Sequence, residues 1–139
     1  QTISERALDL SELVAAEIRA KPVNIGRSRR VAFHTPCTMQ HGLGLKHIVE
    51  GLLGDAGYEV CAIADSHLCC GSAGTYSMLQ PELSAQLRKN KQVALTINNP
   101  DVVATANIGC QMHIANGLGL PVVHWVELIN AALENKGSV

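Results

Sequence analysis

Aromatic residues are scarce in this sequence, which has one Trp, two Tyr and one Phe and an aromatic fraction of 3%. Apolar residues nevertheless make up 47% of it. A buried core must therefore be built mainly from Ala, Val, Leu and Ile. These aliphatic residues are typical of parallel strands covered by helices on both faces. The shortage of aromatics thus favours a parallel α/β protein.

Long apolar runs, blocks of like charge and phosphate-binding loops are also missing. No apolar run approaches the roughly 20 residues that span a bilayer, and the start of the chain does not resemble a signal peptide. Lys and Arg number 11 against 12 Asp and Glu, and these charges are spread along the chain. Neither a G-x-G-x-x-G nor a Walker loop occurs. These absences argue against a transmembrane domain, nucleic-acid binding and nucleotide binding.

The length and the order of the predicted elements indicate one α/β domain. With 139 residues, the chain has the size of one domain with one core, and we take residues 1–139 as that domain. Helices are predicted at 2–20, 39–53, 81–97, 110–118 and 125–133, with a Thr2/Glu5 capping box on the first, and strands at 31–34, 58–64, 102–106 and 121–123. This alternation predicts a mostly parallel sheet of about four strands with helices on both faces, a Rossmann-like three-layer sandwich.

Cysteine is the residue type that carries chemistry here. Five cysteines in a chain without a signal peptide favour thiolate chemistry or metal binding over structural disulfides. Four of them follow successive predicted strands, namely Cys37, the adjacent Cys69 and Cys70, and Cys110. Because the carboxyl ends of parallel strands meet at one edge of the sheet, we expect these four thiols to lie close together. Cys61 falls inside a predicted buried strand and is interpreted as a core residue.

Several neighbouring residues bear on this predicted site. Cys110 and His113 are three positions apart at a helix start, so both side chains can reach one ion. Cys37 and Cys110 lie where helices begin, which should lower the pKa of both thiols. Gly71 should supply the turn that brings two adjacent sulfurs inward. His34 and His41 flank Cys37; each either tunes the thiolate or, as is commoner, is a hydrogen-bonded polar residue.

Three segments together resemble a known family. They are His34-Thr35-Pro36-Cys37, Cys69-Cys70-Gly71-Ser72-Ala73-Gly74-Thr75-Tyr76 and Asn107-Ile108-Gly109-Cys110-Gln111-Met112-His113, and residues 121–128 match as well. In these segments the chain is similar to the Cys-Cys-Gly cysteine-rich domain of heterodisulfide-reductase-like electron-transfer subunits. The greatest similarity is to the branch found in bacterial glycolate oxidase iron–sulfur subunits.

The resemblance implies that Cys37, Cys69, Cys70 and Cys110 bind a [4Fe–4S] cluster, of cubane or non-cubane form. The domain would then belong to a non-flavin subunit of a glycolate dehydrogenase and relay electrons from FAD-containing partner subunits, and it would be inactive alone. The chain opens on Gln1 and lacks the ferredoxin-like Cys motifs of the family, so we expect an N-terminal ferredoxin-like part of the same protein to be missing. The expected location is the cytoplasm, with peripheral attachment to the inner membrane through partner subunits as the alternative.

One departure from the family leaves the metal open. The commoner family pattern ends in Cys-x-x-Cys, whereas His113 stands here at the last position. Thiolates with one imidazole also suit tetrahedral zinc, so a structural zinc domain that mediates subunit assembly is an alternative. A thiol–disulfide oxidoreductase that uses a Cys69–Cys70 disulfide is a third hypothesis.

Overall fold

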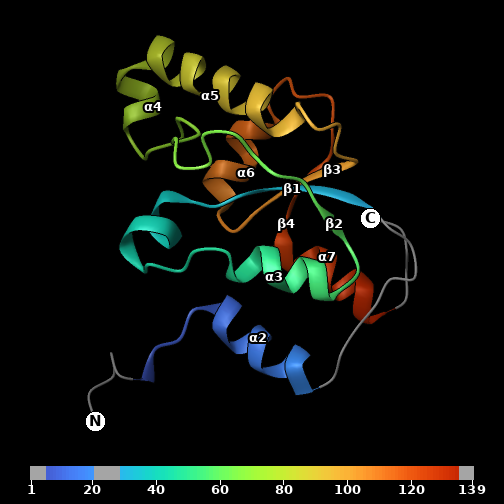
Figure 1. Ribbon diagram of the computed structural model, residues 1–139. Coiled ribbons are helices and arrows are strands. Elements are labelled where there is room, and N and C mark those ends of the chain that lie inside the picture. Colours follow the sequence, from blue (N-terminus) through green and yellow to red (C-terminus); the bar gives the residue numbers. More distant parts are fainter. Residues whose placement is uncertain (1–5, 21–28, 135–139) are drawn as a thin grey trace.

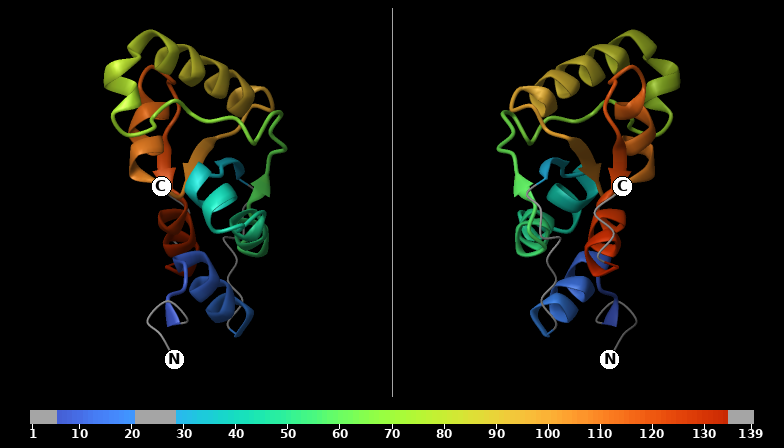
Figure 2. Two further views of the ribbon diagram at one scale, coloured as in Figure 1. Left: turned by 90° about the vertical axis from the view of Figure 1, so that its left-hand side faces the viewer. Right: turned by 90° about the vertical axis from the view of Figure 1, so that its right-hand side faces the viewer.

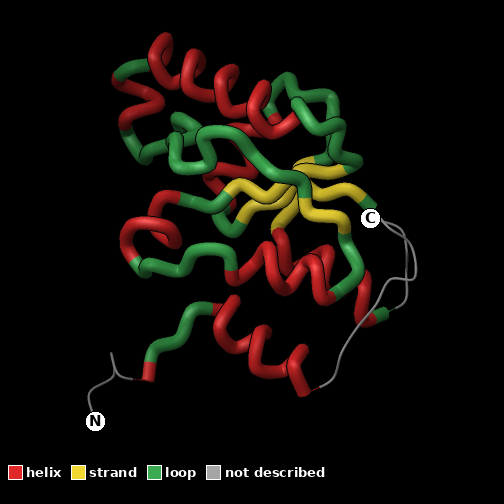
Figure 3. The backbone as a smooth tube through the Cα atoms, in the orientation of Figure 1, coloured by secondary structure: helices red, strands yellow, loops and turns green. Residues whose placement is uncertain are grey.

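Four parallel strands form the centre of the molecule. The computed structural model describes residues 6–20 and 29–134. The strands are β1 (Arg30–His34), β2 (Glu59–Val60), β3 (Val102–Thr105) and β4 (Val122–His124). They pair in the order β2-β1-β3-β4, and every pairing is parallel (Figure 3). The predicted fold class is therefore confirmed.

Helices cover both faces of this sheet. One face carries α5 (Pro81–Thr96) and α6 (Ile108–Ala115), with the short α4 (Tyr76–Leu79) leading into α5 (Figure 1). The other face carries α3 (Ile48–Asp55) and α7 (Trp125–Leu133). Helix α2 (Leu10–Ala20) packs outside α3 and α7, on the side away from the sheet (Figure 2). None of the helices in the described ranges combines the length and the apolar character needed to cross a membrane.

The alternation of side chains along the strands creates two apolar clusters. In β1, Val31 and Phe33 belong to the cluster beneath α3 and α7, whereas Ala32 belongs to the cluster beneath α5 and α6. Val102 and Val103 of β3 divide between the two clusters in the same way. Successive side chains of a strand point to opposite faces, and β1 and β3 are buried on both. A side chain two positions after Ala32 therefore faces α5 and α6.

The chain changes direction across the sheet between β1 and β3. From β1 it runs through α3 to β2 at one edge, and then returns through α5 to β3 on the other side of β1. Such a reversal with helices on opposite faces opens a crevice at the carboxyl ends of the two central strands, where ligands of this fold class bind. His34 and Thr105 are the last residues of those strands, and they are paired in the register.

Several predicted boundaries differ from the observed ones. The predicted helix 39–53 is a π-helical turn over Thr38–Gly42 and the separate helix α3. The two are separated because Gly44 and His47 both have positive φ angles, of 69° and 63°. The predicted strand 58–64 is ordered only over Glu59–Val60, since this edge strand has a single neighbour. Helix α4 was not predicted, and the Thr2/Glu5 capping box lies outside the described residues.

Candidate metal centre

The four predicted cysteines surround one cavity at the carboxyl ends of the central strands. The cavity has a volume of about 260 Å³. Its lining includes the four cysteines together with small or polar residues of the same loops: Pro36, Cys37, Thr38, Cys69, Cys70, Ser72, Ala73, Gly74, Asn107 and Cys110. The convergence expected from the strand order is therefore observed. That these residues bind a metal stays a prediction.

All five cysteines are free thiols, including the adjacent pair. Cys70 is buried, with 1% of its surface exposed, whereas Cys37, Cys69 and Cys110 are partly buried. Cys61 is buried beside Ala32 and Leu95, in the apolar cluster beneath α5 and α6, and it does not line the cavity. Its interpretation as a core residue is confirmed.

Gly71 shapes the turn that brings both adjacent sulfurs to the cavity. Its φ angle is +93°, a left-handed conformation that side chains disfavour. A Cβ atom on Gly71 would lie 2.5 Å from the Ser84 carbonyl oxygen of α5. The Gly71 N–H donates to the Cys69 sulfur at 3.3 Å, and the Ser84 hydroxyl donates to the Gly71 carbonyl oxygen at 2.8 Å. The predicted role of Gly71 is thus confirmed, and Ser84 is a further residue that fixes the turn.

Cys110 is positioned by the start of α6. Asn107 is the N-cap residue of this helix, and its side-chain oxygen accepts the backbone N–H of Cys110 at 3.1 Å. An Asn at this position is a favourable N-cap because it satisfies a backbone donor that has no partner within the helix. The short connection from β3 through this cap places the Cys110 thiol beside Cys70.

Cys70, and neither of the cysteines near helix starts, is the thiol most disposed to ionise. The Cys110 thiol donates to the Cys70 sulfur, and this bond, outweighing the opposing effect of burial, lowers the pKa of Cys70 to about 4. The same bond, together with burial, raises the pKa of Cys110. Burial and the neighbouring Cys69 raise the pKa of Cys37. The predicted lowering of the pKa of Cys37 and Cys110 was therefore wrong, because burial and nearby thiols outweigh the effect of a helix terminus.

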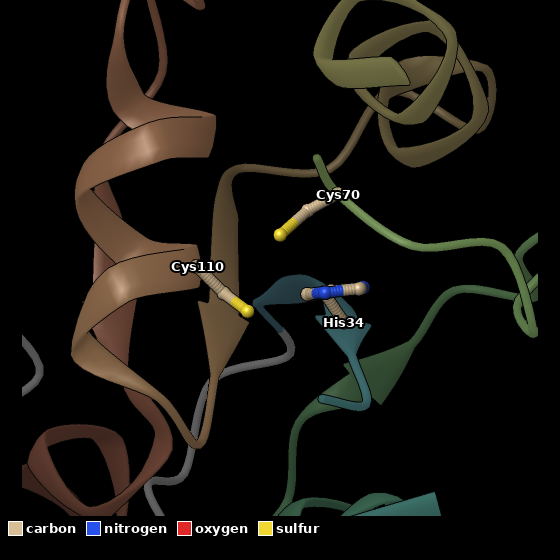
Figure 4. Close-up of side chains that lie close together, drawn as sticks. All are labelled: His34, Cys70 and Cys110. Atoms are coloured by element: carbon tan, nitrogen blue, oxygen red, sulfur yellow. The ribbon is translucent and has the colours of Figure 1, made fainter. Parts of the chain in front are cut away.

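His34 is a site residue that sequence reasoning did not place. It is 2% exposed, and a ring nitrogen lies within 4.8 Å of the Cys70 and Cys110 sulfurs, which also lie within that distance of each other. Figure 4 shows the imidazole beside the two sulfurs, which come from different loops. The usual interpretation of such a histidine as a hydrogen-bonded polar residue does not hold for Nε2, which is buried without a hydrogen-bond partner among the described residues. The alternation of β1 could have indicated it, since His34 follows Ala32 on the same face.

His113 lies at the edge of this group and makes different contacts. Its Nε2 atom is 3.3 Å from the Ser84 hydroxyl oxygen and 3.4 Å from the Ser84 carbonyl oxygen. His113 does not line the cavity that the four cysteines share. It is therefore not among the residues whose donor atoms the structure gathers, and a direct metal bond from His113 stays a prediction.

Lys91 places a buried positive charge behind the cysteine loop. It is 2% exposed, and its ammonium group donates to the carbonyl oxygens of Asp65 at 3.0 Å and of Ser66 at 3.4 Å. Burial lowers the pKa of Lys91, and the nearby cysteines, chiefly Cys70, act in the opposite direction. An ammonium group here attracts anionic sulfur while it holds the start of the loop that leads to Cys69.

Comparison with known proteins identifies relatives over most of the chain. Residues 31–115 match the family described as a cysteine-rich domain, CCG. The chain is 46% identical over 134 residues to the glycolate oxidase iron-sulfur subunit of Escherichia coli, which covers 96% of this chain and 33% of that protein. It is 26% identical over 137 residues to a lactate utilization protein of Bacillus licheniformis, covering 94% and 58%. It is 34% identical over 135 residues to one subunit of the CoM/CoB fumarate reductase of Methanothermobacter marburgensis, covering 90% and 27%. The chain thus spans between 27% and 58% of the length of these relatives.

Proposed function

This chain belongs to the CCG family of cysteine-rich domains, and on that premise we propose that it is an iron–sulfur electron-transfer domain of a glycolate oxidase type of complex. The observation that carries the proposal is the convergence of four free thiols on one cavity, in a chain 46% identical to a glycolate oxidase iron-sulfur subunit. Thiolates are the protein ligands that hold iron–sulfur clusters.

The residues present fit such a cluster. Cys37, Cys69, Cys70 and Cys110 supply four sulfur donors, and a fifth buried donor, Nε2 of His34, has no partner within the described part of the chain. The hydrogen bond from Cys110 favours a thiolate at Cys70, the form that binds soft metals. A cluster of this kind supplies one-electron transfer when it is bound. We propose the four cysteines as its protein ligands, with His113 as the further candidate expected from the sequence.

The position of the cavity suits exchange of electrons with other proteins. Three of its four cysteines are partly exposed, so a redox partner could approach the sulfurs closely at this edge of the sheet. We propose that a flavin-containing subunit donates the electrons, and that residues 1–139 act as one domain of a longer oxidoreductase subunit. Oxidation of the substrate would then take place on the flavin, and the domain alone would be inactive.

The proposal is tested by the metal content and spectra of the chain. Anaerobic reconstitution with iron and sulfide should give visible charge-transfer absorption and bound iron with acid-labile sulfide. Ser substitution of Cys37, Cys69, Cys70 or Cys110 should each abolish retention of the metal, whereas the matched control Cys61→Ser should keep it. Retention of zinc without iron would overturn the proposal and favour the zinc alternative, which the relatives above do not support. Loss of the metal in Cys61→Ser alone would also overturn it.

A further inference from the structure

We propose that His34 supplies a nitrogen ligand to the metal centre, alongside the cysteine sulfurs. The inference rests on the proposed function in one respect, namely that the cavity holds a metal. It goes beyond the cysteine motif, because it assigns a donor from the end of a buried strand.

The backbone of His34 is held rigidly in the sheet. His34 is paired with Thr105 in the parallel register of β1 and β3. The Thr105 hydroxyl, fully buried, donates to the His34 carbonyl oxygen at 2.9 Å. Because side chains alternate along a strand, His34 points to the same face as Ala32, toward the loop that carries Cys70. The direction of the imidazole is therefore set by the sheet.

The surroundings of the ring leave one nitrogen without a partner. Nε2 of His34 is buried and makes no hydrogen bond to any residue in the described ranges. An unsatisfied buried polar atom costs about 1–3 kcal/mol, and such atoms are uncommon in native proteins. A ligand at this site would remove that cost. The unpaired nitrogen is thus a second observation, independent of the cysteine pattern, that points to a bound group.

The neighbouring donor atoms are close enough to share one metal centre with the ring. A nitrogen of His34 and the sulfurs of Cys70 and Cys110 all lie within 4.8 Å of one another (Figure 4). Imidazole nitrogen and thiolate sulfur occur together as ligands of iron–sulfur clusters, where replacing thiolate by imidazole raises the reduction potential. The three donors come from the ends of β1 and β3 and from the loop after β2, the same three segments that surround the cavity.

The second histidine near the site is engaged elsewhere. The single hydrogen of the Ser84 hydroxyl goes to the Gly71 carbonyl oxygen, at 2.8 Å. Nε2 of His113 faces the hydroxyl oxygen and the carbonyl oxygen of Ser84, and both of these can then only accept. Nε2 of His113 must therefore carry a hydrogen and act as a donor, which is incompatible with metal binding through that atom. His34 is the better-placed imidazole, and His113 serves as the matched control.

Pulsed electron paramagnetic resonance of the chemically reduced, reconstituted chain tests the inference. We expect hyperfine coupling to a directly bound nitrogen, and its frequencies should change when the histidines carry ¹⁵N. The coupling should persist in His113→Gln and disappear in His34→Cys, which keeps a donor at position 34 and should have a lower reduction potential. Absence of the coupling in the unsubstituted chain, its survival in His34→Cys, or its loss only in His113→Gln would each overturn the inference.

Cobalt(II) titration separates this inference from the proposed iron–sulfur function. If the chain holds no iron, the proposed function fails, yet the thiolate-to-cobalt absorption band still reports on the donor atoms. His34→Ala should weaken cobalt binding at least tenfold, whereas His113→Gln should leave it within about twofold, with circular dichroism showing that both variants are folded. Equal affinities of His34→Ala and the unsubstituted chain would overturn the assignment of His34, whichever metal the protein holds.

Discussion

The Ser84 hydroxyl donates to the Gly71 carbonyl oxygen at 2.8 Å, and this bond ties α5 to the turn that carries Cys70. Ser84 is 2% exposed, so no water can replace the bond freely. The turn, the helix and the buried thiol therefore form one unit, and its weakest points can be tested by substitution.

Ser84→Ala should destabilise the protein and loosen its hold on the metal. The Gly71 carbonyl oxygen would lose its donor in a buried place, which costs about 1–3 kcal/mol. Ser77→Ala is the matched control, since the Ser77 hydroxyl makes the equivalent bond to the Gly74 carbonyl oxygen at 3.1 Å in an exposed setting. That control should change the free energy of unfolding by less than about 0.5 kcal/mol. Denaturant unfolding measures both variants, and equal effects would contradict the importance of the buried bond.

Gly71→Ala should abolish retention of the metal. The new Cβ would lie 2.5 Å from the Ser84 backbone oxygen, and the φ angle of +93° is unfavourable for any side chain. The turn would have to move, and Cys69 and Cys70 would move with it. Gly74→Ala is the control, because Gly74 also has a positive φ, of +50°, but nothing lies within 4 Å of its added Cβ. It should cost only about 1–2 kcal/mol of stability and keep the metal, as iron analysis would show.

Tyr58→Phe should reveal a contribution to stability that depends on pH. The buried Tyr58 hydroxyl donates to the Leu128 carbonyl oxygen at 2.9 Å, and burial raises the pKa of Tyr58. A raised pKa in the folded state favours the neutral form, so the stabilisation is fully present below about pH 10, the ordinary value. It is lost as the pH rises from there through the folded-state pKa.

We therefore expect Tyr58→Phe to cost about 1 kcal/mol at neutral pH. The difference in free energy of unfolding between the two proteins should shrink above about pH 10, as followed by urea unfolding across that range. A difference that grows with pH would show that the sign of the linkage is wrong. Because Tyr58 contacts α7 and does not line the cysteine cavity, the metal content should not change.

Lys91→Met should lower both the stability of the cysteine loop and the reduction potential of a bound cluster. The Met side chain keeps much of the apolar stem, but the carbonyl oxygens of Asp65 and Ser66 lose their donor, at a cost of about 1–3 kcal/mol. Loss of a buried positive charge near the thiols also disfavours the reduced, more negative state of the cluster.

The control for this charge is Lys89→Met, two positions earlier on α5, where the side chain is exposed. Water screens its charge, so the potential should hardly change. Redox titration of the two variants distinguishes the cases. A potential that falls equally in both would mean that total charge, and not the buried ammonium of Lys91, is responsible.

Much of the fold could be predicted from local patterns. Helix α7 was predicted at 125–133 and is observed at Trp125–Leu133, because its apolar residues recur at helical spacing and Glu127 completes a capping box with His124. The aliphatic strands β1 and β3 were also located correctly to within a residue, since both are buried on two faces. Where a single residue with positive φ interrupts an apolar pattern, as at His47, periodicity alone could not detect the break.

The sequence by itself determined which elements form and in what order they alternate, because these depend on interactions between residues a few positions apart. Through the order of the strands it also predicted that Cys37, Cys69, Cys70 and Cys110 would meet at one edge, as they do. Only the tertiary structure decided how the thiols share a proton and which histidine faces them. Those properties depend on burial and on contacts between distant segments. For that reason Cys70, and not Cys37 or Cys110, has the lowered pKa, and the unpaired buried nitrogen beside the sulfurs belongs to His34.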